Sequence, residues 1–141
     1  MRLRFLTIAL MITFAAFFDA CKSAHSGSLQ YLDQYVGKEP AVVGLWETEP
    51  LHTQLKELMG DKYDPFIKDM KGGGPLTRDQ YIYSLAYITQ DSSRGYAFLL
   101  VDTKSNKIQA AIMTNKEIEK FQSPGEVFVV PAAIQNKLDS L

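Results

Sequence analysis

The chain has 141 residues, with 15 basic and 16 acidic side chains and a formal net charge of −1. This balance lacks the basic excess typical of nucleic-acid-binding proteins, so we expect no nucleic-acid partner. The single cysteine excludes an internal disulfide, and a domain of this length can instead be stabilised by burying most of its apolar surface.

The first 21 residues have the pattern of a bacterial lipoprotein export signal. Arg2 and Arg4 precede an uncharged, largely apolar run over residues 5–18, which at 14 residues is too short to span a bilayer. The run leads into the sequence Phe-Asp-Ala-Cys, which resembles a lipobox ending at Cys21. We therefore expect a signal peptide over residues 1–20 and lipidation of Cys21, with a buried or unpaired thiol as the alternative.

The expected lipid anchor also predicts where the protein resides. Two or three acyl chains attach a protein stably to a membrane, so the folded part need not contact lipid itself. Lys22, rather than an aspartate, would occupy the second position of the mature chain, which by resemblance to lipoprotein-sorting rules favours the outer membrane. We expect a polar tether over residues 21–28 and one periplasm-facing domain over residues 29–141.

The first half of the domain predicts helices. Thr48-Glu49-Pro50 is typical of a helix start, with the Thr48 hydroxyl as the cap and Pro50 in the first turn. Apolar residues then recur at helical spacing until Gly60, which ends the helix. By the same criteria, the expected helices cover residues 29–36, 51–59 and 64–70.

The second half predicts strands. Short runs rich in aromatic and branched residues cover 81–89, 96–102, 107–113 and 126–130. Turn-forming residues at 91–95 and 103–106 separate the first three runs, so these should pair as an antiparallel meander.

Two more helices are expected near the C-terminus. Thr114 and Glu117 have the spacing of a capping box, which predicts a short helix through Phe121. Pro131 can begin a terminal helix, in which one side is lined by Ile134, Leu138 and Leu141. Helices followed by consecutive strands indicate a single α+β domain, in which short helices pack on an antiparallel sheet.

The sequence offers little catalytic chemistry. After residue 20 it has only two histidines, His25 in the tether and His52 on the expected helix, and neither has the partners of a metal site or a general base. We expect no metal, no cofactor and no enzymatic activity. The alternative is a glycan-acting enzyme in which Glu47 and Glu49 form a carboxylate pair and Trp46 stacks on a sugar. Acids before a helix are ordinarily partners of its dipole, and a core position is the simpler interpretation of Trp46.

Several short motifs occur in a fixed order between Tyr35 and the C-terminus. They are an opening segment at 35–45, Gly60-Asp61-Lys62-Tyr63 after a helix, Phe66, Gly74-Pro75-Leu76, and two strand runs flanking a Lys-Ser-Asn turn. In this order they resemble the inhibitor of vertebrate lysozyme family, whose patterns include Y-x-G-x-Y-P-x-D-V and L-L-G-x-x-Y. The resemblance implies an α+β fold and a protein partner, a lysozyme-like muramidase.

The resemblance also implies where such a partner binds. In the family, a loop between two sheet strands, braced by a disulfide in a C-x-x-H-x-C-like pattern, enters the lysozyme cleft, and its histidine meets the catalytic carboxylates. The corresponding stretch here, residues 87–95, has neither cysteine nor histidine, so the family's site residues do not transfer. Arg94 offers a guanidinium instead, with a solvent-exposed turn residue as the alternative. The candidate binding loop consists of Gln90, Asp91, Ser92, Ser93, Arg94 and Gly95.

Together these observations predict a non-enzymatic envelope lipoprotein that binds a muramidase or a related cell-wall-targeting protein. The alternatives are a structural envelope lipoprotein without a soluble ligand and the glycan-acting enzyme that uses Glu47, Glu49 and Trp46. Binding by the 87–95 loop, as opposed to catalysis near residue 47, distinguishes the first reading from the enzyme.

Overall fold

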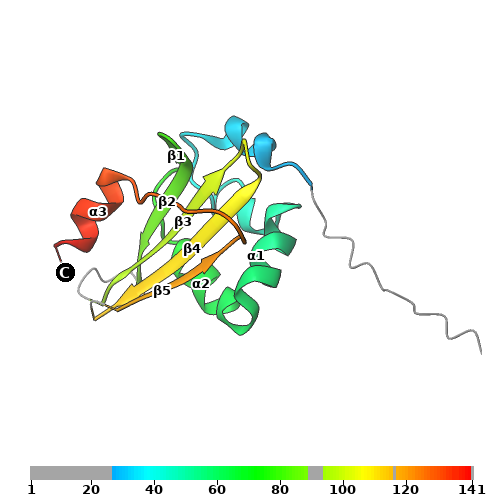
Figure 1. Cartoon of the computed structure of the whole chain (residues 1–141). Coiled ribbons are helices and arrows are strands. Elements are labelled where there is room, and N and C mark those ends of the chain that lie inside the picture. The colour runs from blue at the N-terminus through cyan, green and yellow to red at the C-terminus, as the bar shows by residue number, and fades with distance from the viewer. Residues whose placement is uncertain (1–26, 89–93, 116, 141) are drawn as a thin grey trace, which may run out of the picture.

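Five antiparallel strands form one sheet in the order β1-β2-β3-β4-β5, so every strand pairs with its neighbour in sequence. The structure, a computed structural model, describes residues 27–88, 94–115 and 117–140. Figure 1 shows the sheet with its helices. The strands are β1 (Thr77–Arg78), β2 (Ile82–Tyr87), β3 (Tyr96–Asp102), β4 (Lys107–Thr114) and β5 (Glu117–Gln122). The predicted meander and the predicted α+β class are confirmed.

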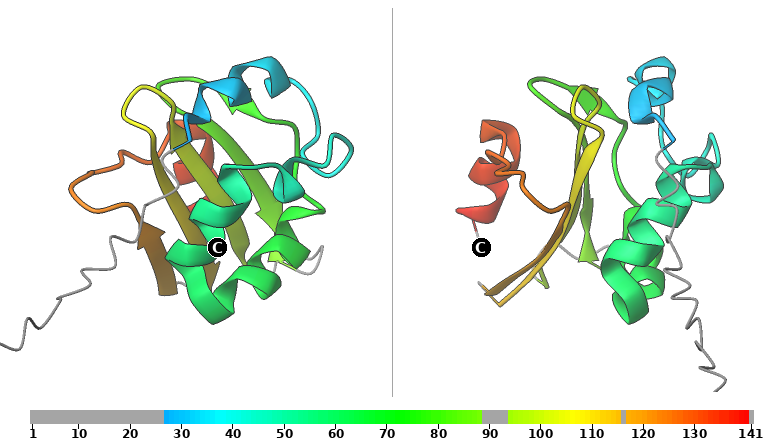
Figure 2. Two further views of the ribbon diagram at one scale, coloured as in Figure 1. Left: turned by 90° about the vertical axis from the view of Figure 1, so that its right-hand side faces the viewer. Right: turned by 45° about the vertical axis from the view of Figure 1, so that its right-hand side comes forward.

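Helices lie on both faces of this sheet, as the turned views in Figure 2 show. One face carries α1 (Leu51–Met59) and α2 (Tyr63–Met70), together with the 3-10 helices η1 (Leu29–Tyr35), η2 (Leu45–Glu47) and η3 (Gly60–Lys62). The other face carries α3 (Ala132–Leu138). The predicted helices at 29–36, 51–59, 64–70 and after Pro131 are confirmed, the first as a 3-10 helix; Leu141 lies outside the described residues.

The central strand β3 is buried on both faces, which divides the core into two layers. Side chains of a strand alternate between the faces of its sheet. Ala97, Leu99 and Val101 therefore pack toward α1 and α2, whereas Tyr96, Phe98 and Leu100 pack toward α3. This double burial explains why β3 is a nearly continuous apolar run in the sequence.

The start of α1 follows the predicted signal, but its capping group differs. The Thr48 hydroxyl donates to the Gly44 carbonyl at 2.9 Å and does not cap the helix. Glu49 takes that role, since its carboxylate accepts the backbone N–H of Thr53 at 3.2 Å and the hydroxyl of the same residue at 2.9 Å. A carboxylate at this helix end is also favoured by the helix dipole.

The predicted helix from Thr114 through Phe121 is wrong, because Glu117–Gln122 forms strand β5. Asn115 adopts φ +50°, a left-handed conformation that asparagine tolerates better than most residues. With only two residues between them, Thr114 and Glu117 lie opposite each other in a tight hairpin. Residues 117–122 therefore pair with the free edge of β4 and form a strand, although their local sequence also suits a helix.

The predicted strand at Glu126–Val130 is also wrong, since these residues belong to no strand. Gly125 turns the chain at φ +76°, and the segment then crosses to the face that carries α3. Phe128 is buried there against Tyr81, with ring centroids 5.1 Å apart, whereas Val127 is 84% exposed. Alternating burial therefore arises here without strand pairing.

Among the described residues, no helix has the length and apolar character needed to cross a membrane. The predicted signal peptide, Cys21 and most of the predicted tether, including His25, lie outside the described residues.

Candidate functional site

The connection between β2 and β3 lies at the same end of the sheet as the connection between β4 and β5. This follows from the antiparallel order of the five strands. Of the candidate loop, the structure describes Arg94, which is exposed, and Gly95, which is buried. Gln90, Asp91, Ser92 and Ser93 lie outside the described residues.

The base of this connection is closed by a hydrogen bond and an aromatic contact. The Ile88 backbone N–H donates to the Gly95 carbonyl at 3.1 Å. Tyr87 and Tyr96 lie directly opposite each other on β2 and β3, and their ring centroids are 5.1 Å apart with an interplanar angle of 43°. The two ends of the candidate loop are therefore held at a fixed separation.

Gly95 is also pressed against the neighbouring strand β4. Its φ is +132°, and a Cβ atom added there would lie 1.8 Å from the Met113 carbonyl oxygen and 3.2 Å from the Ile88 Cδ1 atom. No side chain fits at this distance, so only glycine permits the close approach of the two backbones. The close contact with β4 therefore fixes the position of the Gly95 backbone, where the connection joins β3.

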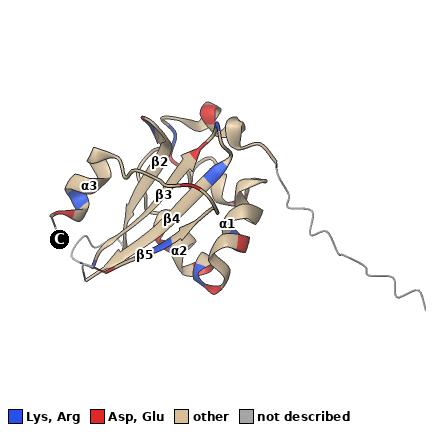
Figure 3. Ribbon diagram, viewed as in Figure 1, with Lys and Arg blue, Asp and Glu red and all other residues tan. Residues whose placement is uncertain are grey.

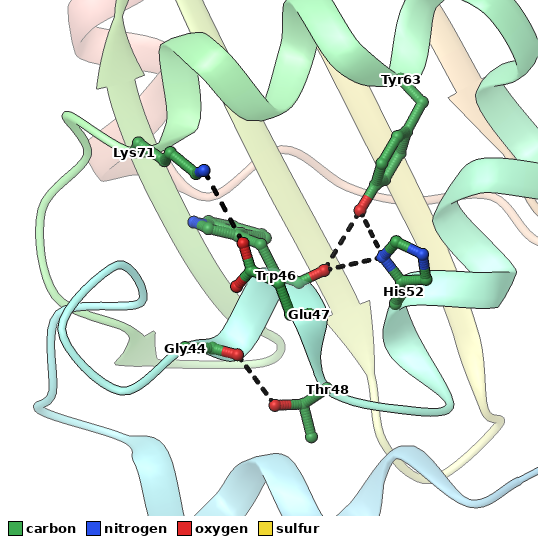
Figure 4. A network of polar contacts seen from close by, with 7 residues as sticks. All are labelled: Gly44, Trp46, Glu47, Thr48, His52, Tyr63 and Lys71. Atoms are coloured by element: carbon green, nitrogen blue, oxygen red, sulfur yellow. Dashed lines mark hydrogen bonds and ion pairs between the residues drawn. The ribbon is translucent and has the colours of Figure 1, made fainter.

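The alternative catalytic group at Trp46, Glu47 and Glu49 is engaged in structural contacts. Trp46 is 1% exposed and belongs to the core on the α1 side, so its ring cannot serve as a sugar platform. Glu47 forms an exposed ion pair with Lys71 at 3.7 Å, as Figure 4 shows. Glu49 caps α1 through Thr53. Each of the three residues thus has a role in the fold.

His52 links the same region to α2. Its Nδ1 atom lies 3.0 Å from the Trp46 carbonyl oxygen, which can only accept, and 2.7 Å from the Tyr63 hydroxyl (Figure 4). The Tyr63 hydroxyl also donates to the Trp46 carbonyl at 3.1 Å. Burial, reinforced by Glu47, Asp64 and Glu49, raises the pKa of Tyr63 to about 12 and keeps its hydroxyl neutral. The network joins η2, α1 and α2 and explains His52 without catalysis.

The electrostatic features of the described residues do not point to a metal or to nucleic acid. Basic and acidic residues are intermixed along the ribbon in Figure 3. No group of three or more histidine, cysteine, aspartate or glutamate residues within the described ranges is arranged to hold a metal ion. Among the described residues, the arrangement that remains is the exposed Arg94 beside strand ends that are held together, and exposed residues between strands often contact other proteins.

Sequence reasoning missed the residues that form this base. Tyr87, Tyr96, Met113 and Ile118 lie in one cross-strand row over four strands. The sequence does show two tyrosines on either side of a polar turn. Whether they lie opposite each other can be decided only from the register of the hairpin. The sequence predicts that Gly95 turns the chain, whereas its contact with Met113 depends on the position of β4.

The chain was compared with family models, curated proteins and solved structures, and one family model matches it. The family model described as Inhibitor of vertebrate lysozyme (Ivy) matches residues 50–141, which contain α1 to α3 and the whole sheet. The opening segment at 35–45, which also resembles the family, precedes the matched region. No curated protein and no solved structure matches the chain. Because the match covers most of the chain, this protein belongs to the inhibitor of vertebrate lysozyme (Ivy) family.

Proposed function

We propose that this protein is a non-enzymatic envelope lipoprotein that binds a lysozyme-type muramidase and protects the cell wall from it. The observation that carries the proposal is the family match over residues 50–141, because the family is described as Inhibitor of vertebrate lysozyme (Ivy). In this proposal the contact element is the β2–β3 connection, because the family resemblance implies an inhibitory loop between two sheet strands.

Arg94 is the residue in this loop best suited to meet the partner's catalytic acids. It is exposed and directly precedes Gly95, whose backbone is fixed against β4. A guanidinium presents forked donors that can engage a carboxylate through two parallel hydrogen bonds. In this proposal Arg94 takes the place of the family's histidine. Asp91, three positions earlier in the sequence, carries the same charge as the partner's catalytic acids and therefore opposes binding.

The two rival functions have less support. A glycan-acting enzyme would need Glu47 and Glu49 to be available to substrate, yet one is paired with Lys71 and the other caps α1. Neither rival accounts for the family match.

The test is inhibition of muramidases by the purified protein carrying Cys21→Ser. Lysozymes of several structural types, together with muramidase effectors secreted by competing bacteria, are assayed on suspended cell walls by the loss of turbidity. We expect at least one of these enzymes to be inhibited at one-to-one stoichiometry. Absence of binding in a pull-down with every enzyme would contradict the proposed function, and turnover of cell walls by the protein itself would support the enzyme.

The proposed lipid anchor and membrane location are tested separately. Lipidation of Cys21 predicts that the mature N-terminus carries acyl chains and that the protein fractionates with the outer membrane. Mass spectrometry of the mature protein detects the acyl mass, and a Cys21→Ser variant should be released to the soluble fraction. A Cys21→Ser protein that stays on the membrane would rule out this anchor.

A further inference from the structure

We propose that a noncovalent brace built from Tyr87, Tyr96, Met113 and Gly95 holds together the two ends of the β2–β3 connection, Ile88 and Gly95, in place of the disulfide that the family resemblance implies. The proposal rests on the function proposed above, because it concerns the loop that makes the contact. It names positioning residues, and none of them is required to touch the partner.

The first part of the brace is a continuous row across the sheet. Tyr87 lies opposite Tyr96, Tyr96 opposite Met113, and Met113 opposite Ile118. Directly opposite residues of antiparallel strands point to the same face, here the face that carries α3. Tyr96 is 4% and Met113 9% exposed, whereas the end members Tyr87 and Ile118 are each 40% exposed. The buried centre of the row ties the base of the loop to β4.

The second part is the close approach of Gly95 to β4. A Cβ atom at this position would lie 1.8 Å from the Met113 carbonyl oxygen, so the loop exit and the strand are in backbone contact. The Gly95 carbonyl also accepts the Ile88 N–H at 3.1 Å. Gly95 therefore links the loop exit to the loop entrance and to β4.

A brace of this kind has a functional consequence. A loop that must be ordered on contact loses affinity through the entropy of ordering, and preorganisation removes that cost. The chain has one cysteine, so no disulfide can close residues 87–95. Aromatic pairs add about 0.5–1.5 kcal/mol beyond their buried area, so the tyrosine pair can hold the loop ends where a covalent bond is lacking.

The geometry supplies a direct test by disulfide replacement. The hydrogen bond between Ile88 and Gly95 makes that pair the hydrogen-bonded one, so the next pair, Tyr87 and Tyr96, is of the non-hydrogen-bonded type with the shorter Cα separation. Such pairs are within reach of a disulfide. A chain with Cys21→Ser, Tyr87→Cys and Tyr96→Cys can therefore be compared with itself in reduced and oxidised forms.

Two readouts are measured on the full chain carrying Cys21→Ser. One is hydrogen exchange of the Ile88 amide in the free protein, and the other is the dissociation constant for a muramidase that the unsubstituted protein inhibits. We expect Tyr87→Ser to accelerate exchange and to weaken binding by about fivefold each, from the loss of one aromatic pair. The matched control Tyr87→Phe keeps the ring and should change neither. The double-cysteine protein should be weak when reduced and restored when oxidised.

The outcomes separate this proposal from the proposed function. If no muramidase binds the unsubstituted protein, the proposed function fails, and the exchange of Ile88 still decides whether the brace exists. Unchanged exchange in Tyr87→Ser overturns the brace. If oxidation of the double-cysteine protein restores slow exchange but not affinity, Tyr87 is a contact residue and its role as a positioning residue is overturned.

Discussion

The two hairpin connections that flank β3 are built in opposite ways. At the β3–β4 turn, the Asp102 carboxylate accepts the backbone N–H groups of Lys104 at 2.9 Å and Ser105 at 3.3 Å. Asn106 follows at φ +58°, and its side-chain oxygen accepts the N–H of Leu29 at 2.7 Å, which ties the turn to η1. The polar groups of this turn are thus used within the protein.

The β2–β3 connection is longer than the β3–β4 turn. The contacts described at its two ends include the tyrosine pair, the Ile88 to Gly95 hydrogen bond and the approach of Gly95 to Met113. Arg94, next to Gly95, is exposed. Under the function proposed above, the β3–β4 turn contributes to the fold, whereas the β2–β3 connection contacts the partner. Substitutions of exposed side chains in the two connections should therefore affect different properties, while Gly95 should affect stability because it is buried against β4.

The largest effect is expected from Gly95→Ala. The added methyl group meets the Met113 carbonyl oxygen and forces a φ that other residues avoid, so we expect a loss of about 3 kcal/mol or more in the free energy of unfolding. Urea denaturation measures this loss. Gly74→Ala is the control, because its Cβ would meet nothing within 4 Å, and it should change stability by less than about 0.5 kcal/mol. Equal stability of the two variants would show that the close approach of Gly95 to β4 does not require glycine.

The next effect is on binding alone. Arg94→Ala should weaken binding to an inhibited muramidase by about 2 kcal/mol if the guanidinium meets buried carboxylates, since truncating one partner of such a pair leaves the other unpaired. The melting temperature should stay nearly unchanged, because an exposed turn side chain contributes little buried area. Lys104→Ala, an exposed cation in the other turn, is the control and should leave affinity unchanged. Unaltered affinity in Arg94→Ala would reject the role of this residue.

The third effect is on stability alone and concerns the β3–β4 turn. Asn106→Ala removes the acceptor for the buried Leu29 N–H and places alanine in a left-handed conformation, which should cost about 2 kcal/mol together. Asn106→Gly restores the backbone freedom but not the acceptor, so it should cost about 1 kcal/mol. Affinity for the muramidase should be unchanged in both variants. A loss of affinity without a loss of stability would show that this turn also contacts the partner.

The smallest effect is a pH dependence in the same turn. Although burial raises the pKa of Asp102, the backbone N–H groups of Lys104 and Ser105 outweigh it and lower that pKa below its usual value. The stability that the charged carboxylate contributes is therefore fully present above the unfolded pKa of about 3.9 and is lost as pH falls through the folded pKa.

Asp102→Asn tests this dependence, because it keeps an acceptor oxygen and removes the charge. We expect less than about 1 kcal/mol of lost stability at pH 7, and a weaker decline of stability in acid than the unsubstituted protein shows. Denaturant titrations at pH 7 and near pH 3 measure both quantities. An acid response identical to that of the unsubstituted protein would assign the decline to other carboxylates.

The same contrast between local and distant contacts explains which elements the sequence could predict. The meander of β2, β3 and β4 follows from strand-forming runs separated by turn residues, so neighbouring residues contain enough information. The helices α1 and α2 likewise follow from apolar spacing and from Gly60. In contrast, Glu117–Gln122 has a local pattern that suits a helix, and only the free edge of β4 makes it a strand. The segment 126–130 has the pattern of a strand but finds no partner, because Gly125 directs it toward α3.

By itself the sequence determined the α+β class, the antiparallel meander and the family resemblance, because apolar periodicity, turn residues and motif order are local properties. It also located the candidate loop between two strands. Only the tertiary structure decided that Trp46 is core and that Gly95 must be glycine, since burial and a 1.8 Å approach to Met113 arise when distant segments pack together. The pairing of Tyr87 with Tyr96 depended on the register of the sheet, and no residue at either position reveals that register alone.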